Sequence, residues 1–183
     1  MNSPTTDEPA AQPSRRYWIL GGAIIVIALV LDQLTKYWIL SDPAFRAVPC
    51  LRGEAPCGAV RVTDFFSLTM RWNQGVSYGL LQAEGLARWA LVILQLGIAV
   101  GFTVWLFRAQ RLLTAISLSL VIGGAVGNNL FDRVRFGAVV DFLDFSSLLP
   151  WFPYIFNVAD TAISVGAALL LLDQVLAGRK SSG

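Results

Sequence analysis

The sequence predicts an integral membrane protein that is mainly α-helical, with four transmembrane helices and a small extracytoplasmic β-sheet cap. Of its 183 residues, 55% are hydrophobic and only 14% are charged, which leaves too few charges to cover a soluble globule. The apolar residues form four blocks, each long enough to cross a bilayer as a helix. Between the first two blocks, the alternation of β-branched and aromatic residues is typical of short strands.

The elements follow one another in a single membrane domain, residues 17–176. The four spans are expected at about 17–40, 86–107, 112–131 and 157–176, the cap at about 41–85, and a second outer connection at about 132–156. Residues 1–16 are rich in Pro, Ser and Thr and predict a disordered cytoplasmic tail, and residues 177–183 predict a second cytoplasmic tail. The first span is too long for the apolar core of a cleavable signal peptide, so we expect it to be retained.

An even number of spans places both termini on one side of the membrane. Basic residues lie near the helix ends on that side, namely Arg15, Arg16, Arg108, Arg111, Arg179 and Lys180. The positive-inside rule therefore predicts that this side is cytoplasmic. Other arginines fall on the opposite side, mostly in the long first connection, where charge has less influence on orientation.

Within the predicted cap, residues 59–63 and 65–72 are expected to form strands, and the segment from Asn73 to Gly79 a tight turn. The cap also holds the only two cysteines, Cys50 and Cys57. If the cap faces an oxidising compartment, these two can form a disulfide. Otherwise they are a pair of small buried thiols.

Composition excludes several kinds of function. The net charge of +2 is spread over short connections, so no basic face is available for nucleic acid. Histidine is absent, which excludes Ser-His and Cys-His nucleophile pairs and His-ligated metal sites. Two cysteines alone do not make a zinc site. We therefore expect no metal and no cofactor, and chemistry that depends on carboxylates, amides, hydroxyls, Arg or Lys.

The predicted topology places the polar residues that point to a function at the outer membrane face. They are Asp32, Lys36, Asn73, Asn129, Asp132, Arg133, Asp141, Asn157 and Asp160. Ionisable groups beside bilayer-length apolar segments are energetically costly, so such a cluster indicates function. Asp32 and Lys36 are four residues apart and share one helix face, where they can at least neutralise each other.

Asp141 and Asp160 are predicted to meet at the membrane surface and to share one proton. Two adjacent carboxylates cannot both ionise, so one can take a proton from water while the other donates to a carbonyl oxygen, as in aspartic proteases. Asn157 precedes Asp160 by one helical turn and can orient it or a substrate carbonyl. Arg133 can hold a backbone carbonyl or a lipid phosphate. Asp132 is expected to pair with Arg133 or a helix end.

Two alternative functions use the same residue types. A proton- or cation-coupled transporter also needs intramembrane carboxylates, but its sites lie near the bilayer midplane, whereas these carboxylates cluster at one end of the spans. A Ser-Lys hydrolase needs Lys36 beside a serine such as Ser41 or Ser77, and no spacing in the sequence indicates such a pair. The acid-pair protease is therefore the favoured interpretation.

Five blocks of sequence carry a resemblance to a known family. They are Asp32-Gln-Leu-Thr-Lys36, Asn73-x-Gly75-x-x-x-Gly79, Gly123 to Arg133, Val139-Val-Asp141-Phe, and Phe156-Asn157-Val-Ala159-Asp160. In this order, over residues 17–176, the sequence resembles the bacterial lipoprotein signal peptidases (signal peptidase II), which are membrane aspartic proteases.

The resemblance implies that Asp141 and Asp160 are the catalytic pair. It implies a supporting or substrate-binding role for Asp32, Lys36, Asn73, Gly75, Asn129, Asp132, Arg133, Asn157 and Ala159. The implied reaction cleaves a prolipoprotein before its diacylglyceryl-modified cysteine, at the periplasmic face of the bacterial cytoplasmic (inner) membrane. The implied partners are this precursor, membrane lipid and the inhibitor globomycin, and the protein is expected to be a monomer.

The sequence departs from the family pattern at three places. Asn128 stands where glycine is usual, while Asn129 keeps the spacing to Asp132, so either Asn can face the site. Ser77 and Tyr78 replace the commoner Ala and Phe of the turn. The cysteine pair belongs to no motif of the family.

Overall fold

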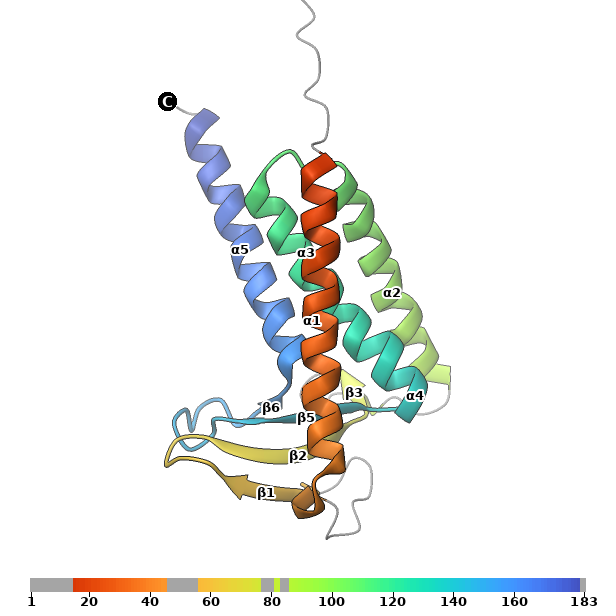
Figure 1. Cartoon of the computed structure of the whole chain (residues 1–183), viewed down its shortest axis with the longest axis vertical. Coiled ribbons are helices and arrows are strands. Elements are labelled where there is room, and N and C mark those ends of the chain that lie inside the picture. Colours follow the sequence, from red (N-terminus) through yellow and green to blue (C-terminus); the bar gives the residue numbers. More distant parts are fainter. Residues whose placement is uncertain (1–14, 46–55, 77–80, 83–85, 182–183) are drawn as a thin grey trace, which may run out of the picture.

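In the computed structural model, four long helices lie side by side, and a small antiparallel sheet lies at one end of the bundle, beside the last turns of the first helix (Figure 1). The structure describes residues 15–45, 56–76, 81–82 and 86–181. The helices are α1 (Arg15–Ser41), α2 (Leu86–Phe107), α3 (Leu112–Val126), α4 (Val134–Phe136) and α5 (Val158–Ser181), with the 3-10 turn η1 (Pro43–Phe45) and the π-helix η2 (Gly127–Arg133). The strands are β1 (Gly58–Arg61), β2 (Ser67–Asn73), β3 (Gly75–Val76), β4 (Leu81–Gln82), β5 (Val139–Asp144) and β6 (Ile155–Phe156).

The predicted fold class is confirmed. Among the described residues, four helices are long and apolar enough to cross a membrane, namely Tyr17–Ser41, Trp89–Phe107, Leu112–Phe136 and Val158–Arg179. The first described residue, Arg15, and the last, Ser181, both lie at the end of the bundle away from the sheet (Figure 1). This arrangement matches an even number of spans with both ends on one side.

The third span is longer than predicted. The sequence predicts its end at residue 131, but α3 continues through η2 and α4 to Phe136, and Gly137, which follows, adopts a left-handed conformation (φ 75°). The polar residues that suggested a helix end, such as Asp132 and Arg133, are instead buried against other elements. A π-helical turn of this kind often marks a functional site.

Two other helix ends differ from the prediction. Helix α1 begins at Arg15 rather than residue 17, and α5 runs to Ser181 rather than residue 176. Backbone hydrogen bonds continue a helix past its apolar part into polar sequence, which hydropathy does not detect. Part of each predicted cytoplasmic tail is therefore helical.

The sheet is not confined to the predicted cap. Its four strands are ordered β1-β2-β5-β6 and all pairs are antiparallel, while β3 and β4 form a separate pair. Strands β5 and β6 come from the segment that was predicted as a connection, residues 132–156. Because β5 pairs with β2, Asp141 lies on a strand opposite Arg71 rather than in a loop.

An apolar core holds the sheet against α1. It contains Ile39 from α1, Phe45 from η1, and Cys57, Met70, Val140 and Phe142 from the strands and their flanks. Cys50 lies outside the described residues, so its disulfide with Cys57 stays a prediction. The end of the predicted turn, Ser77 to Gly79, also lies outside them.

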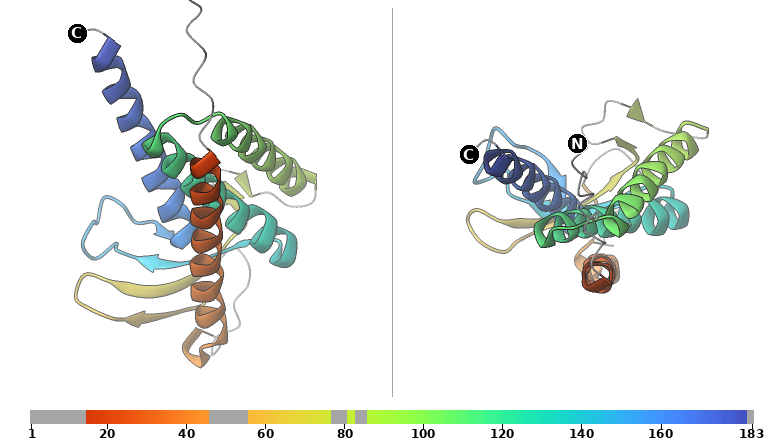
Figure 2. Two further views of the ribbon diagram at one scale, coloured as in Figure 1. Left: turned by 45° about the horizontal axis from the view of Figure 1, so that its top comes forward. Right: turned by 90° about the horizontal axis from the view of Figure 1, so that it is seen from above.

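Helix α3 lies at the centre of the bundle. In an 18-residue apolar stretch of its span, 67% of the residues are buried, whereas 11 to 17% are buried in the corresponding stretches of the other three spans. Seen from above, α1 lies on one side of α3, and α2 and α5 diverge on the other side (Figure 2). Gly123 packs against Ile25 and Ala28 of α1. Gly124 packs against the Ala159 carbonyl of α5, so glycines allow α3 to approach both neighbours closely.

One buried acidic residue that was not predicted from the sequence lies at the opposite end of the bundle from the other buried carboxylates. Asp173 of α5 is buried and accepts hydrogen bonds from the Arg111 guanidinium and the Thr114 hydroxyl at the start of α3. This contact joins α5 to α3 at the end remote from the sheet.

Gly124→Ala is expected to destabilise the protein by about 1–3 kcal/mol, because the new methyl group would overlap the Ala159 carbonyl and the Ile163 side chain. The matched control is Gly22→Ala, which replaces a helical glycine with no atom within 4 Å of the added Cβ. Thermal unfolding in detergent should show a lower Tm for the first variant only. An equal Tm for both variants would contradict the tight α3–α5 contact.

Candidate functional site

A cavity of about 510 Å³ opens where α2, η2 and α5 meet the sheet. Its polar lining is Asn73, Gln95, Asn128, Asn129, Arg133, Asp141, Asp160, Thr161 and Ser164, and its apolar lining includes Val139, Phe152, Ile155, Phe156 and Ile163. Asp141 reaches it from β5, and Asp160 from the first turn of α5. The predicted acid pair therefore faces one space, although the two residues come from different elements.

Asn157 fixes the start of α5 and, with it, the position of Asp160. Its side-chain oxygen accepts the Asp160 backbone N–H at 2.8 Å, and the Asp160 Oδ2 accepts the Asn157 backbone N–H at 3.2 Å. This is a reciprocal capping box, in which an N-cap residue and the acid three positions later satisfy each other's free backbone donors. The short spacing in the sequence thus sets the orientation of the Asp160 carboxylate.

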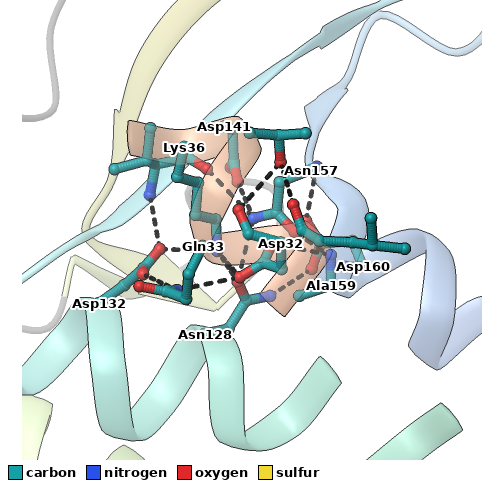
Figure 3. A network of polar contacts seen from close by, with 12 residues as sticks. Asp32, Gln33, Lys36, Asn128, Asp132, Asp141, Asn157, Ala159 and Asp160 are labelled. Carbon is teal, nitrogen blue, oxygen red and sulfur yellow. Dashed lines mark hydrogen bonds and ion pairs between the residues drawn. The ribbon is translucent and has the colours of Figure 1, made fainter. Parts of the chain in front are cut away.

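Asn157 also joins the two acids directly (Figure 3). Its amide nitrogen donates to Asp141 Oδ1 at 2.7 Å, and also contacts the Val140 carbonyl at 3.2 Å. The second oxygen of Asp141 accepts from the Asn73 amide at 3.0 Å. Both oxygens of Asp141 are therefore held in fixed positions.

Asn128 completes the link on the other side of Asp160. Its amide nitrogen donates to Asp160 Oδ1 at 2.8 Å, and its oxygen accepts from the amide of Asn157 at 3.0 Å and from the Lys36 ammonium at 2.8 Å. Each oxygen of the Asp160 carboxylate thus has a donor. Asn128 connects the acid pair to a second group of charges.

Burial of Asp141, reinforced by the negative charge of Asp160, raises the pKa of Asp141 to about 8. This pKa is lowered by the hydrogen bonds from Asn73 and Asn157 and by the positive charge of Lys36, but less than burial raises it. At neutral pH the Asp141 carboxyl group is therefore mostly protonated. The pair can hold a single proton, as expected for two adjacent carboxylates.

The second group of charges is centred on Lys36, which is 2% exposed. Its ammonium contacts Asp32 at 2.7 Å and Asp132 at 2.8 Å, and both acids are fully buried. Gln33 donates to the same two carboxylates. We call Lys36, Asp32 and Asp132 the lysine cluster.

The lysine cluster holds the backbone beside each acid of the pair. Asp32 accepts the N–H of Ala159, the residue before Asp160, at 3.0 Å. Asp132 accepts the N–H of Val140, the residue before Asp141, at 3.2 Å. One buried charge cluster therefore positions both acid-bearing segments, from α5 and from β5.

The partner of Asp132 differs from the sequence-based expectation. Asp132 pairs with Lys36 rather than with Arg133 or a helix end. Arg133 donates to the carbonyls of Gln74 and Gly75, at 3.2 and 2.6 Å, and so holds the β2–β3 turn over the cavity. Within that turn, the Gly75 N–H donates to the Asn73 side-chain oxygen, which orients the Asn73 amide towards the acid pair.

Of the two asparagines left open by the sequence, Asn128 makes the contacts with the acid pair. Asn129 lines the same cavity, but its amide donates to the Ala125 carbonyl in the preceding turn of α3. Asn128 and Asp132 are four residues apart and both contact Lys36. That spacing is the signal in the sequence by which Asn128 could have been found.

A Ser-Lys pair does not form among the described residues. The three polar partners of Lys36 are Asp32, Asp132 and Asn128, and the Ser41 hydroxyl donates to the Trp38 carbonyl. Ser77 lies outside the described residues.

Comparison with known proteins gives a consistent result. Residues 24–176 match the family described as Signal peptidase (SPase) II. The lipoprotein signal peptidase of Caulobacter vibrioides is 44% identical over 168 residues, which cover 92% of this chain and 93% of that protein. The lipoprotein signal peptidase of Methylorubrum extorquens is 41% identical, over 84% of this chain and 85% of that protein.

Solved structures show the same fold. A bacterial membrane enzyme determined by the in meso method at 2.3 Å resolution superposes with a TM-score of 0.70 and 26% identity, covering 85% of this chain and 87% of that chain. A second bacterial membrane enzyme, at 1.9 Å, gives a TM-score of 0.68, with 85% and 92% coverage.

Proposed function

The chain belongs to the signal peptidase II family, the lipoprotein signal peptidases, and we propose that Asp141 and Asp160 catalyse its cleavage of prolipoprotein signal peptides. One observation supports this proposal most directly: two carboxylates from separate elements line one cavity and are bridged by Asn157. In a chain without histidine, such a pair supplies both the acid and the base of peptide hydrolysis. The transporter alternative has no support from the family or its relatives.

The proposed reaction uses one proton on the acid pair. Protonated Asp141 donates to the carbonyl oxygen of the scissile bond, while ionised Asp160 takes a proton from the attacking water. The tetrahedral intermediate then collapses, its proton returns to Asp141, and Asp160 gives its proton to the leaving amine. The products are a carboxylic acid and an amine, and the pair returns to its starting state.

Arg133 is a proposed substrate-binding residue. It lines the cavity and is 5% exposed, and its Nε–H has no acceptor within the described part of the chain. A buried cationic donor of this kind is strongly favoured to bind a carbonyl oxygen. The backbone carbonyl next to the scissile bond is the substrate group that fits this donor.

The substrate is proposed to be a prolipoprotein cleaved before a diacylglyceryl-modified cysteine. The cavity combines the acid pair with apolar side chains of α5 and β6, such as Ile163 and Phe156, which suit both a peptide and acyl chains. Globomycin is the proposed inhibitor of the same cavity. The protein is proposed to act as a monomer.

The protein is a multi-pass membrane protein, and we propose that it lies in the bacterial inner membrane with the cavity at the periplasmic face. Arg108 directly follows α2, Arg111 directly precedes α3 and Arg179 lies in the last turn of α5, and these helix ends lie away from the sheet (Figure 1). This basic end fits the cytoplasmic side by the positive-inside rule.

The proposed substrate is tested with two forms of one precursor, with and without the diacylglyceryl group on its cysteine. We expect purified protein in detergent micelles to cleave only the modified form, as resolved by gel shift and mass spectrometry of the products. Equal cleavage of both forms would contradict the lipid requirement. Cleavage of neither form would contradict the proposed function itself.

The raised pKa of Asp141 predicts the alkaline limit of activity. Protonated Asp141 is the proposed acid, and it loses its proton as the pH rises through about 8. We therefore expect kcat/KM to fall about tenfold per pH unit above that pKa. Recovery of activity on return to pH 7 controls for unfolding, and activity that still rises at pH 9 would contradict the assignment.

A further inference from the structure

One polar side chain in the cavity has no role in the reaction proposed above. Gln95 lies in α2, within the membrane-spanning part Trp89–Phe107, and it lines the cavity that holds the acid pair. Its side-chain oxygen is buried and accepts no hydrogen bond from any described residue. The neighbouring positions of α2, such as Ile93 and Leu94, are apolar and exposed on the surface of the bundle.

An unsatisfied amide oxygen is unfavourable at this position. Bilayer hydrocarbon offers no donor, and a buried acceptor without a partner carries its full desolvation cost. Leucine in its place would cost less and would extend the apolar sequence of α2. A second polar group of α2, the Thr103 hydroxyl, donates to the Ala99 carbonyl within the helix. Gln95 thus differs from Thr103 in facing the cavity rather than its own helix.

The position of Gln95 in the cavity determines which part of the substrate can contact it. It lies nine residues after Leu86, about 13 Å along α2 from the end near the sheet. On the α5 side, Ser164 lines the same cavity one helical turn beyond Asp160. The cavity therefore extends from the acid pair towards the bilayer interior, which is the side of the signal peptide and not of the released lipoprotein.

The unsatisfied side-chain oxygen of Gln95 determines which substrate group can bind there. A carboxamide oxygen needs a hydrogen-bond donor. The ester oxygens of a diacylglyceryl group only accept hydrogen bonds, so they cannot satisfy it. A peptide backbone N–H can, and a chain that is extended for cleavage has N–H groups without intrahelical partners. These conditions meet in the last residues of the signal peptide before the scissile bond.

We propose that Gln95 is a substrate-binding residue whose side-chain oxygen accepts a backbone N–H of the signal peptide within the membrane, just before the cleavage site. This inference rests on the proposed function of the cavity. It assigns α2 a part in substrate recognition in addition to its packing against α3.

The test combines a variant with an altered substrate backbone. The full-length protein is assayed with a diacylglyceryl lipopeptide in which each amide before the scissile bond is replaced in turn by an ester, which removes one N–H. For the all-amide substrate, Gln95→Leu is expected to raise KM about 3- to 10-fold with little change in kcat. For wild type, ester replacement at one position should raise KM by a similar factor. For Gln95→Leu, ester replacement at that same position should not raise KM further.

The matched control is Thr103→Val, which removes a polar group from the same helix without lining the cavity and should leave KM unchanged. Because leucine suits the membrane better than glutamine, Gln95→Leu should unfold no more easily than wild type. A wild-type KM for Gln95→Leu, or equal losses for both proteins at every ester position, would overturn the inference. Failure of wild type to cleave the all-amide lipopeptide would instead contradict the proposed function.

Discussion

Asp141→Asn and Asp160→Asn are each expected to lower kcat/KM for a lipid-modified precursor by at least about 10³-fold. Asparagine has nearly the same shape as aspartate but cannot carry or transfer the proton that the proposed reaction needs. The carboxamide oxygen introduced by Asp141→Asn can still accept from one of the two amides that donate to Asp141, those of Asn157 and Asn73. Loss of activity in a folded protein is therefore the expected result. Single-turnover assays with the purified variants measure it.

The dependence of Tm on pH distinguishes a catalytic role of Asp141 from a structural one. Because the pKa of Asp141 is raised in the folded protein, the carboxyl group contributes its full stability below its unfolded pKa near 4 and loses it as the pH rises to about 8. Asp141→Asn removes this dependence, so its Tm should change less than that of wild type between these pH values. A variant that is inactive and unfolded at pH 6 would not support the catalytic assignment.

The matched control for Asp141 is Asp144→Asn on the same strand. Asp144 accepts hydrogen bonds from Thr69 and from Ser146, and it does not line the cavity. We expect Asp144→Asn to keep cleavage within a few-fold of wild type. If Asp132→Asn alone were inactive while Asp141→Asn or Asp160→Asn remained active, the acid pair would have been assigned to the wrong residues.

The membrane helices could be predicted from the sequence because each depends on local composition. A block such as residues 86–107 is apolar over its whole length, and its end at Arg108 is equally visible. The capping box of Asn157 and Asp160 is also local, since it needs only residues three apart. The predicted start of the fourth span at residue 157 already places Asp160 in the first turn of that helix.

The sheet and the lysine cluster could not be predicted in the same way. Strand β5 reads as part of a connection, because its partner β2 lies about 70 residues earlier in the chain and no local pattern indicates the pairing. Asp132 was expected to pair with its neighbour Arg133 for the same reason. Its actual partner, Lys36, is on another helix, so only the packing of α1 against α3 and η2 reveals the contact.

Lys36→Met is expected to destabilise the protein by about 3–5 kcal/mol, because it leaves two carboxylates buried without their cation. Asp32 and Asp132 are both fully buried, and Lys36 is their shared cationic partner. Activity should fall as well, because these carboxylates hold the backbone N–H groups of Ala159 and Val140 beside the acid pair. Unfolding in mixed micelles measures the first effect, and cleavage of the modified precursor measures the second.

A triple variant distinguishes loss of a cation from loss of packing. Adding Asp32→Asn and Asp132→Asn to Lys36→Met removes the uncompensated charges, and replacement of a complete buried ion cluster by neutral groups is often nearly neutral for stability. The triple variant should therefore recover most of the lost stability. Arg61→Met, which breaks the exposed Arg61–Asp64 pair, should leave unfolding unchanged. If Lys36→Met unfolds like wild type, or if the triple variant is no more stable than the single one, the lysine cluster does not hold the acid-bearing segments by its charges.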